Sequence, residues 1–245
     1  MHRFFLPLEN FTADIIPLPA DTADQIRKVL RLKDGDTICL LDNVGKAFEA
    51  EIEYTDAKSI CAHVKRSYTV LNEPGCRISM FLSLTQREKF EWMLQKCTEA
   101  GAFAFIPIYS ERSLVRNGDD VIQKYPRWQK IIQEAAEQSE RGIIPILHKP
   151  MKFSDAVQTG STDTVRLFFW EEERQQTLQQ ALQPMKAGLS AASIIIGPEG
   201  GFSRDEADLA TSTGWISTTL GKRIYRVETA AIASVILTLY ELDRQ

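Results

Sequence analysis

From residue 76 onward, the chain alternates apolar strand-like runs with segments of helical pattern. Strands are expected at 78–84, 103–109, 165–170, a run at Ile194, and 215–220. Helices are expected at 87–100, 127–139, a Gln-rich segment ending before Pro184, a segment starting at Ser203, and 228–242. Strict alternation of this kind predicts an α/β fold, a parallel sheet with helices on both faces.

The first 70 residues have a different pattern. Short β-type runs at 37–41, 47–54 and 59–64 are separated by turn signals, and a short helix at about 22–30 precedes them. They predict a small β-barrel-like domain. We therefore expect a first domain at 1–70, a linker at 71–75 and a second domain at 76–245.

Two C-terminal segments, 194–203 and 220–231, each read as a strand, a glycine-bearing loop and the start of a helix. In an open α/β sheet such strand ends line the crevice where ligands bind. The first loop has two interpretations. It is either a tight strand-to-helix connection that binds no ligand, or a ligand-binding loop. Pro198 followed by Glu-Gly-Gly exceeds what a turn requires, which favours a site. Neither a dinucleotide fingerprint nor a Walker loop is present.

Charged residues follow both loops. Ser203 and Glu206 have the spacing of a capping box, which specifies the start of a helix. Arg223, Arg226 and Glu228 indicate chemistry on a polar or anionic partner. The alternative is a solvated loop in which Glu228 simply favours a helix N-terminus, and residue types alone leave both open.

Two further segments have more than one interpretation. The final helix is apolar on most sides, so it is buried in a core or against a second subunit. The segment 25–33 carries four cations, which indicates either an ordinary solvated helix face or part of an RNA contact.

Composition excludes several classes of protein. The formal net charge is -4, so the chain as a whole is not a basic nucleic-acid binder. No apolar run approaches the roughly 20 residues that span a bilayer. We expect no signal peptide, no membrane partner and a cytoplasmic location. The four cysteines are far apart, as free thiols in a reducing compartment are. The three histidines are scattered, so no metal is expected. No Gly-x-Ser-x-Gly elbow of a hydrolase occurs.

Motifs along nearly the whole chain resemble one family. They are the segments 3–5, 29–36, 95–101, 107–113, 134–141, 196–203 and 220–230. In this order and spacing they resemble the ribosomal RNA small-subunit methyltransferase E family, which belongs to the knotted SPOUT methyltransferases.

The resemblance implies an N-terminal PUA-like RNA-binding domain and a C-terminal α/β domain with a deep trefoil knot. It implies S-adenosyl-L-methionine as cofactor. It also implies methylation of N3 of a uridine in 16S rRNA (uridine 1498) within the small ribosomal subunit. A homodimer is expected, with each active site completed across the interface. Uridine N3 must lose a proton, so a general base or a cation stabilising the anion is required.

Candidate residues follow from the motifs and the resemblance together. Those expected at the cofactor are Trp170, Glu171, Gly197, Pro198, Glu199, Gly200, Gly201, Leu220, Gly221, Arg223, Ile224, Tyr225, Thr229 and Ala230. Those expected at the reaction are Arg223 and Arg226, which contact an anion or phosphate, and Glu228, which orients them. Those expected to contact RNA phosphates are Arg3, Arg27, Lys28, Arg31, Lys33, Arg112, Arg116 and Arg141. The residues do not identify the base.

Three positions depart from the family pattern: Ala100 and Tyr225 each replace a usual Leu, and Val227 replaces a usual Thr. The last loses a hydroxyl in the cofactor loop.

Three alternatives stay open. One is a SPOUT enzyme with another RNA target, the second a non-catalytic RNA-binding or assembly factor, and the third a metabolic enzyme that binds a nucleotide at the sheet edge.

Overall fold

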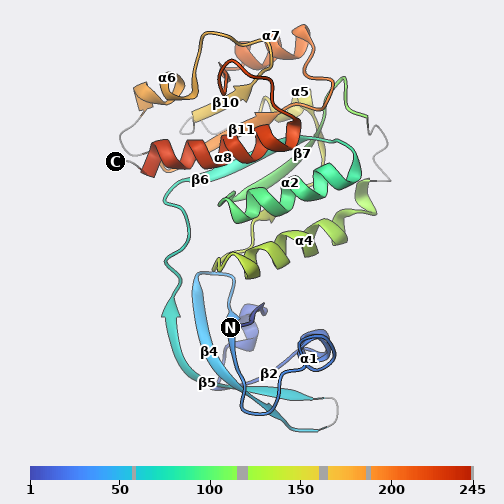
Figure 1. Cartoon of the computed structure of the whole chain (residues 1–245), viewed down its shortest axis with the longest axis vertical. Helices are drawn as coiled ribbons and strands as arrows, with labels where there is room; N and C mark the ends of the chain where they lie inside the picture. Colours follow the sequence, from blue (N-terminus) through green and yellow to red (C-terminus); the bar gives the residue numbers. More distant parts are fainter. Residues whose placement is uncertain (57–58, 115–120, 160–164, 186–188, 244–245) are drawn as a thin grey trace. The chain divides into compact units, whose positions relative to one another are not determined.

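The computed structural model describes residues 1–56, 59–114, 121–159, 165–185 and 189–243. The chain forms two compact units (Figure 1). The first contains Met1–Glu73 and Ala136–Ile144, and the second contains Pro74–Ala135 and Pro145–Gln245. The return of 136–144 to the first unit depends on long-range contacts, so no local pattern in the sequence indicates it.

The first unit is built on a five-stranded sheet with the order β1-β3-β4-β5-β2. Its strands are β1 (Arg3–Phe5), β2 (Ile15–Pro17), β3 (Thr37–Leu41), β4 (Lys46–Tyr54) and β5 (Ile60–Thr69). The pair β1–β3 is parallel and the other pairs are antiparallel. The strand at 37–41 was predicted with these bounds. Strands β1 and β2, of three residues each, are too short to show a period.

Short helices lie between these strands. They are η1 (Leu8–Asn10), α1 (Ala20–Asp24) and η2 (Gln25–Leu30), the last a segment of π-helix. The predicted helix at 22–30 is therefore real, but it begins earlier and changes type midway. Ala23 and Ile26 from these turns join the buried core that Ile16, Ile38 and Ile52 form on the sheet.

The second unit is built on a seven-stranded parallel sheet with the order β12-β10-β11-β6-β7-β8, in which β9 also pairs with β7. Its strands are β6 (Arg77–Ser83), β7 (Ala104–Tyr109), β8 (Ile146–Leu147), β9 (Met151–Lys152), β10 (Val165–Phe169), β11 (Ala191–Ile196) and β12 (Ile216–Thr218). The predicted parallel α/β sheet is confirmed. The knot that the resemblance implies stays a prediction.

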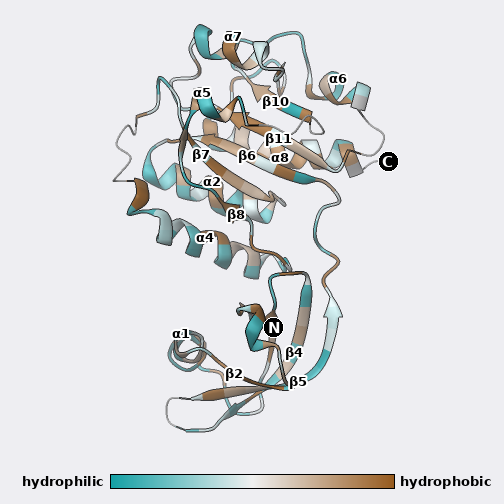
Figure 2. Cartoon of the chain, turned by 180° about the vertical axis from the view of Figure 1, so that it is seen from behind, coloured by the Kyte–Doolittle hydropathy of each residue, from teal (hydrophilic) through white to brown (hydrophobic). Residues whose placement is uncertain are grey.

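Helices cover both faces of this sheet (Figure 1). They are α2 (Arg87–Glu99), α4 (Tyr125–Gln138), α5 (Phe153–Ala156), α6 (Leu178–Leu182), η3 (Gln183–Met185), α7 (Arg204–Ser212) and α8 (Val227–Asp243). Helices α2 and α8 pack against each other, and α5 contacts α7. Figure 2 shows hydrophobic colour along the central strands and mixed colour along α4.

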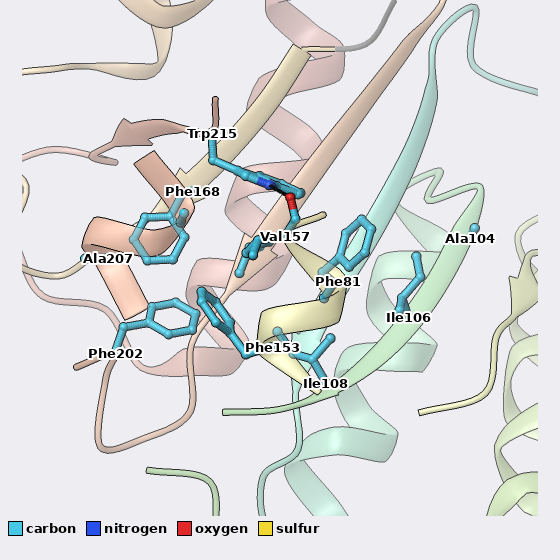
Figure 3. Close-up of a cluster of buried hydrophobic side chains, with 13 residues drawn as sticks. Phe81, Ala104, Ile106, Ile108, Phe153, Val157, Phe168, Phe202, Ala207 and Trp215 are labelled. Carbon is cyan, nitrogen blue, oxygen red and sulfur yellow. Dashed lines mark hydrogen bonds between the residues drawn. The ribbon is translucent and has the colours of Figure 1, made fainter. Parts of the chain in front are cut away.

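An aromatic cluster fills the face that α5 and α7 cover (Figure 3). The rings of Phe168 and Phe202 lie 4.6 Å apart, and that of Phe153 lies 5.3 Å from Phe202. The indole Nε1 of Trp215 donates to the carbonyl of Val157 at 3.0 Å. Because Phe202 directly follows the glycine loop, its burial ties that loop to the core of the unit.

Glu91 links α2 to α4, and we expect this link to make stability depend on pH. Its carboxylate accepts from Arg127 Nε at 2.7 Å and from Arg87 Nε at 3.0 Å. The hydrogen bond from Arg127 is the main reason that the pKa of Glu91 lies below its ordinary value. A carboxyl group whose pKa is lowered by folding adds stability at any pH above its pKa in the unfolded chain. This stability is lost as the pH falls through its pKa in the folded protein.

Glu91→Gln should therefore lower the free energy of unfolding at neutral pH by about 1 kcal/mol, since both arginines are more than half exposed and solvent screens the pair. Urea unfolding of both proteins measures the difference. This difference should shrink as the pH falls below the ordinary pKa of a glutamate, and a difference independent of pH would contradict this explanation.

Candidate active site

Three loops meet at one edge of the parallel sheet. Phe169 at the end of β10 is in register with Ile196 of β11 on one side and with Thr218 of β12 on the other. Because these strands are parallel, the loops that follow them start at the same level. Together they line a cavity of about 660 Å³.

Nearly all residues predicted at the cofactor line this cavity. From the three loops these are Trp170, Glu171, Gly197, Pro198, Glu199, Gly200, Gly201, Leu220, Gly221, Arg223, Ile224, Tyr225 and Ala230. Thr229 does not line it and is exposed. The cavity also contains Arg226 and Glu228, so the structure brings the three residues predicted at the reaction into the same wall.

The glycine loop after β11 needs its glycines for different reasons. A Cβ on Gly197 would lie 2.9 Å from the buried Phe202 ring. Gly201 has a φ of +69°, a conformation that side chains disfavour. A Cβ there would lie 1.7 Å from Oε1 of Glu171. Backbone and carboxylate therefore approach each other closely at Gly201.

Hydrogen bonds hold the exit of this loop. Ser203 and Glu206 form the predicted capping box at the start of α7, with Ser203 N–H donating to Glu206 Oε2 at 3.0 Å. Glu206 Oε1 also accepts from the backbone N–H of Glu111 at 2.8 Å. Arg112, predicted to contact phosphate, donates from Nη1 to the carbonyl of Gly200 at 3.0 Å. In this structure Arg112 thus supports the glycine loop.

The loop after β10 is organised around Glu173. Its carboxylate accepts from the backbone N–H groups of Arg174, Gln175 and Gln176 at 2.9, 2.8 and 3.2 Å. Burial raises the pKa of Glu173, but these donors lower it, and the net shift is downward. The Nε1 of Trp170 is buried without a hydrogen-bond partner among the described residues. The Arg204 guanidinium lies 5.1 Å from the centre of its ring.

The loop after β12 is hydrogen-bonded to the loop after β10 and then leads into α8. Thr219 N–H donates to the carbonyl of Gln176 at 2.8 Å, which joins it to the loop after β10. Gly221 has a φ of +116°. Arg223 Nη2 donates to the Tyr225 hydroxyl at 3.0 Å. The tyrosine that replaces the usual leucine therefore orients an arginine, and Val227 is buried at the start of the helix.

Two cations of the cavity wall were missed in the sequence. Lys89 of α2 pairs with Glu199 at 3.0 Å, and Arg174 lines the cavity from the loop after β10. No local signal marks Lys89, because it lies 110 residues from its partner. Arg174 could have been recognised, since it directly follows the acidic run 171–173 at a predicted strand end.

The cations predicted to contact RNA differ in their availability. Arg3 pairs with Glu140 at 3.0 Å, and Lys28 pairs with Asp24, as Arg27 does. Arg31 and Lys33 are exposed. Arg116 lies outside the described residues.

Arg141 departs from its prediction. It is 3% exposed, and its Nη2 lies 2.7 Å from Glu73 Oε2. Arg141 is therefore a buried structural cation in this chain, and we do not retain it as a phosphate contact. The pattern 134–141 did not distinguish a helix end that packs inward from one that faces solvent.

Other chemistry finds no support among the described residues. No group of three or more His, Cys, Asp or Glu side chains is placed to hold a metal ion in that part of the chain. No helix in the described ranges has the length and apolar character needed to cross a membrane. The cysteines are free thiols, and burial raises the pKa of Cys97.

Comparisons with known proteins agree with this geometry. The family described as RNA methyltransferase domain matches residues 72–239, and that described as RNA methyltransferase PUA domain matches residues 26–65. Ribosomal RNA small subunit methyltransferase E of Mesomycoplasma hyopneumoniae is 32% identical over 95% of this chain and 96% of its own length. The Synechocystis protein of the same name is 31% identical over 94% and 74%.

A solved structure is similar over almost the whole chain. The ribosomal RNA small subunit methyltransferase E of Neisseria gonorrhoeae, bound to S-adenosyl methionine, matches with a TM-score of 0.88 and 29% identity. The match covers 98% of this chain and 97% of that one.

Proposed function

The chain belongs to the ribosomal RNA small subunit methyltransferase E family, and on this premise we propose that it methylates N3 of a uridine in 16S rRNA. The cofactor is S-adenosyl-L-methionine, as in the Neisseria gonorrhoeae relative. The observation that carries the proposal is the cavity at the ends of β10, β11 and β12, where a glycine loop meets Arg223, Arg226 and Glu228.

The residues present fit this cofactor. A volume of about 660 Å³ lies in the range of roughly 300–1,000 Å³ that ligand sites have. The space that a Cβ on Gly201 would fill is taken by the Glu171 carboxylate, whereas the same space at Gly221, which also lines the cavity, is open, so backbone groups there can approach a ligand. When bound, S-adenosyl-L-methionine supplies a methyl group on a sulfonium. The loops at 170–171, 197–201 and 220–225 would hold it.

The protein's own part in the reaction is positioning and charge. The two arginines of the wall suit the oxygen atoms of uracil, where negative charge develops as N3 loses its proton. Fixing the uridine against the cofactor converts an encounter of two molecules into a reaction within one complex. Neither role needs a metal ion.

The RNA partner is the small-subunit rRNA, and we propose that the first unit binds it together with the cavity rim. Support comes from the exposed Arg31 and Lys33 and from the PUA-domain match over residues 26–65. We also propose that the chain forms a homodimer through α8. Ile236, Leu237 and Tyr240 expose 49%, 42% and 57% of their surface there. Sedimentation in solution tests the mass.

The deciding experiment is methyl transfer from radiolabelled S-adenosyl-L-methionine to small ribosomal subunits that lack the modification, followed by mass mapping of the labelled RNA. N3-methyluridine near the 3′ end of 16S rRNA, at the position of uridine 1498, is the expected product. Label at another nucleotide would indicate another RNA target. Cofactor binding without any label would indicate a non-catalytic RNA-binding factor.

Arg31→Glu should weaken RNA binding without changing the cofactor site. Arg31 is exposed, and no ion pair holds its side chain among the described residues. Loss of one phosphate contact should reduce the slope of log affinity against log salt by about 1. Filter binding at several salt concentrations measures this slope, and calorimetry measures cofactor affinity. Lys46→Glu, an exposed reversal on β4 outside the predicted RNA set, is the control. Weaker cofactor binding in Arg31→Glu would contradict the assignment of RNA binding to this unit.

A further inference from the structure

One buried oxygen of the cavity wall has no hydrogen-bond partner in the part of the chain that the structure describes. Oε2 of Glu228 is buried, and the described residues provide no hydrogen-bond donor for it. Glu228 lies in the first turn of α8 and lines the cavity. A buried carboxylate oxygen without a donor is unfavourable. A donor on a molecule bound in the cavity would remove this cost once the carboxylate of Glu228, which lines the cavity, turns toward it.

The other carboxylates of the wall are placed differently. Glu199 pairs with Lys89 at 3.0 Å, so its charge is already balanced. Glu171 packs against the backbone of Gly201. Neither has a buried oxygen lacking a partner in the described ranges. Glu228 is thus the carboxylate of this cavity that is best arranged to accept a hydrogen from a ligand.

Cations stand on the same stretch of chain. Arg226 precedes Glu228 by two residues and is exposed, and no ion pair or hydrogen bond engages its side chain among the described residues. Arg223 is held by the Tyr225 hydroxyl at 3.0 Å. Lys89 and Arg174 are the other cations of the wall. An arginine–carboxylate–arginine set offers a donor, an acceptor and a donor.

Uracil presents the complement of that set. Its edge has O2 as acceptor, N3–H as donor and O4 as acceptor. We propose that Glu228 is a catalytic residue that accepts the N3 proton of the target uridine while Arg223 and Arg226 face its two oxygens. This inference rests on the proposed function and names the base that the function requires. An ammonium group at Glu228 would meet the two arginines as like charges, which makes the cofactor's amino group the weaker candidate.

The step balances in atoms and electrons. The N3–H bond breaks, and its proton passes to the carboxylate of Glu228. The electron pair left on N3 forms the bond to the methyl carbon, while the pair of the broken carbon–sulfur bond stays on sulfur. The sulfonium charge and the carboxylate charge are both lost, so the products are neutral at these positions.

Glu228→Gln tests the proposal, because it keeps the shape but cannot take the proton. The single-turnover rate with small ribosomal subunits lacking the modification should fall by about 10²- to 10⁴-fold. The residual rate should rise about tenfold per pH unit, since solvent must then ionise the uridine. Affinity for S-adenosylhomocysteine, measured by calorimetry, should stay within about twofold. Glu228→Asp should keep part of the rate, and Glu134→Gln, the same change at an exposed position of α4, should keep all of it.

The outcomes separate the possible errors. A Glu228→Gln protein with the wild-type rate would overturn the proposal. A variant whose affinity for S-adenosylhomocysteine falls tenfold or more would also overturn it, since Glu228 would then contact the cofactor. If Glu228→Gln did not fold, as judged by its thermal melt, Glu228→Asp with a wild-type rate and pH profile would overturn the proposal. No transfer by the wild-type protein would reject the proposed function itself, whatever Glu228 does.

Discussion

Gly201→Val should abolish measurable cofactor binding, with a loss of affinity of about 100-fold or more, or roughly 3 kcal/mol. Its φ of +69° is a conformation that β-branched residues almost never adopt. The Cβ of the valine would also lie 1.7 Å from Oε1 of Glu171. Backbone and carboxylate must both move, and both line the cavity. Calorimetric titration with S-adenosyl-L-methionine measures the effect.

A second glycine provides the matched control. Gly214 has a φ of +88°, and its Cβ would lie 2.7 Å from the end of the Arg166 side chain, outside the cavity. Gly214→Val should therefore carry similar backbone strain and keep its cofactor affinity. Gly200→Val should have a smaller effect than Gly201→Val. Gly200 has no positive φ, and a Cβ added there would lie 3.1 Å from the Cβ of Arg112. Equal affinity of the Gly201 and Gly214 variants would refute the role of this loop.

Glu73→Ala should destabilise the first unit by about 3–5 kcal/mol, because it removes a carboxylate that pairs with the buried guanidinium of Arg141. Arg141 Nη2 lies 2.7 Å from Glu73 Oε2. Glu73 Oε1 also accepts from the N–H groups of Gly142 and Ile143 at 3.0 and 3.3 Å. Unfolding in urea gives the change in free energy, and hydrogen exchange should show the amides of Gly142 and Ile143 exposed first.

Two further variants distinguish this mechanism from a general loss of charge. Glu49→Ala removes a carboxylate whose partner, Arg66, is 70% exposed, so it should cost less than about 1 kcal/mol. The double variant Glu73→Ala with Arg141→Met should regain much of the loss, because no charge then remains buried. A Glu73→Ala protein as stable as Glu49→Ala would show that the buried pair is not needed.

Local pattern was sufficient where the interacting groups are close in sequence. The capping box of Ser203 and Glu206 spans one helical turn, and it starts α7 as predicted. Gly101, which follows the predicted helix at 87–100, has a φ of +104°, a conformation typical of a glycine just beyond a helix end. The strands from Thr37–Leu41 onward followed from apolar runs and turn residues, except for the two-residue strands β8 and β9, which were not predicted. The glycine loop was found because its composition exceeds what a connection requires.

Long-range contacts decided the remaining features. The order β12-β10-β11-β6 places β11 between two strands that precede it in the chain, and this order brings three loops to one edge. Lys89 pairs with Glu199, which lies 110 positions away in the chain. Arg141 is buried against Glu73, which lies 68 positions away. The short strands β1 and β2 exist only because longer strands pair with them.

The sequence by itself determined the fold class, the glycine loops and the residue types at the candidate site, because these depend on backbone preferences and on periods of two to four residues. The tertiary structure decided which of those residues share a cavity, which cations are already paired and which carboxylate oxygen lacks a donor. These properties depend on burial and on contacts between distant segments. Free energies of that kind are summed over the whole fold, and no local stretch of sequence contains them.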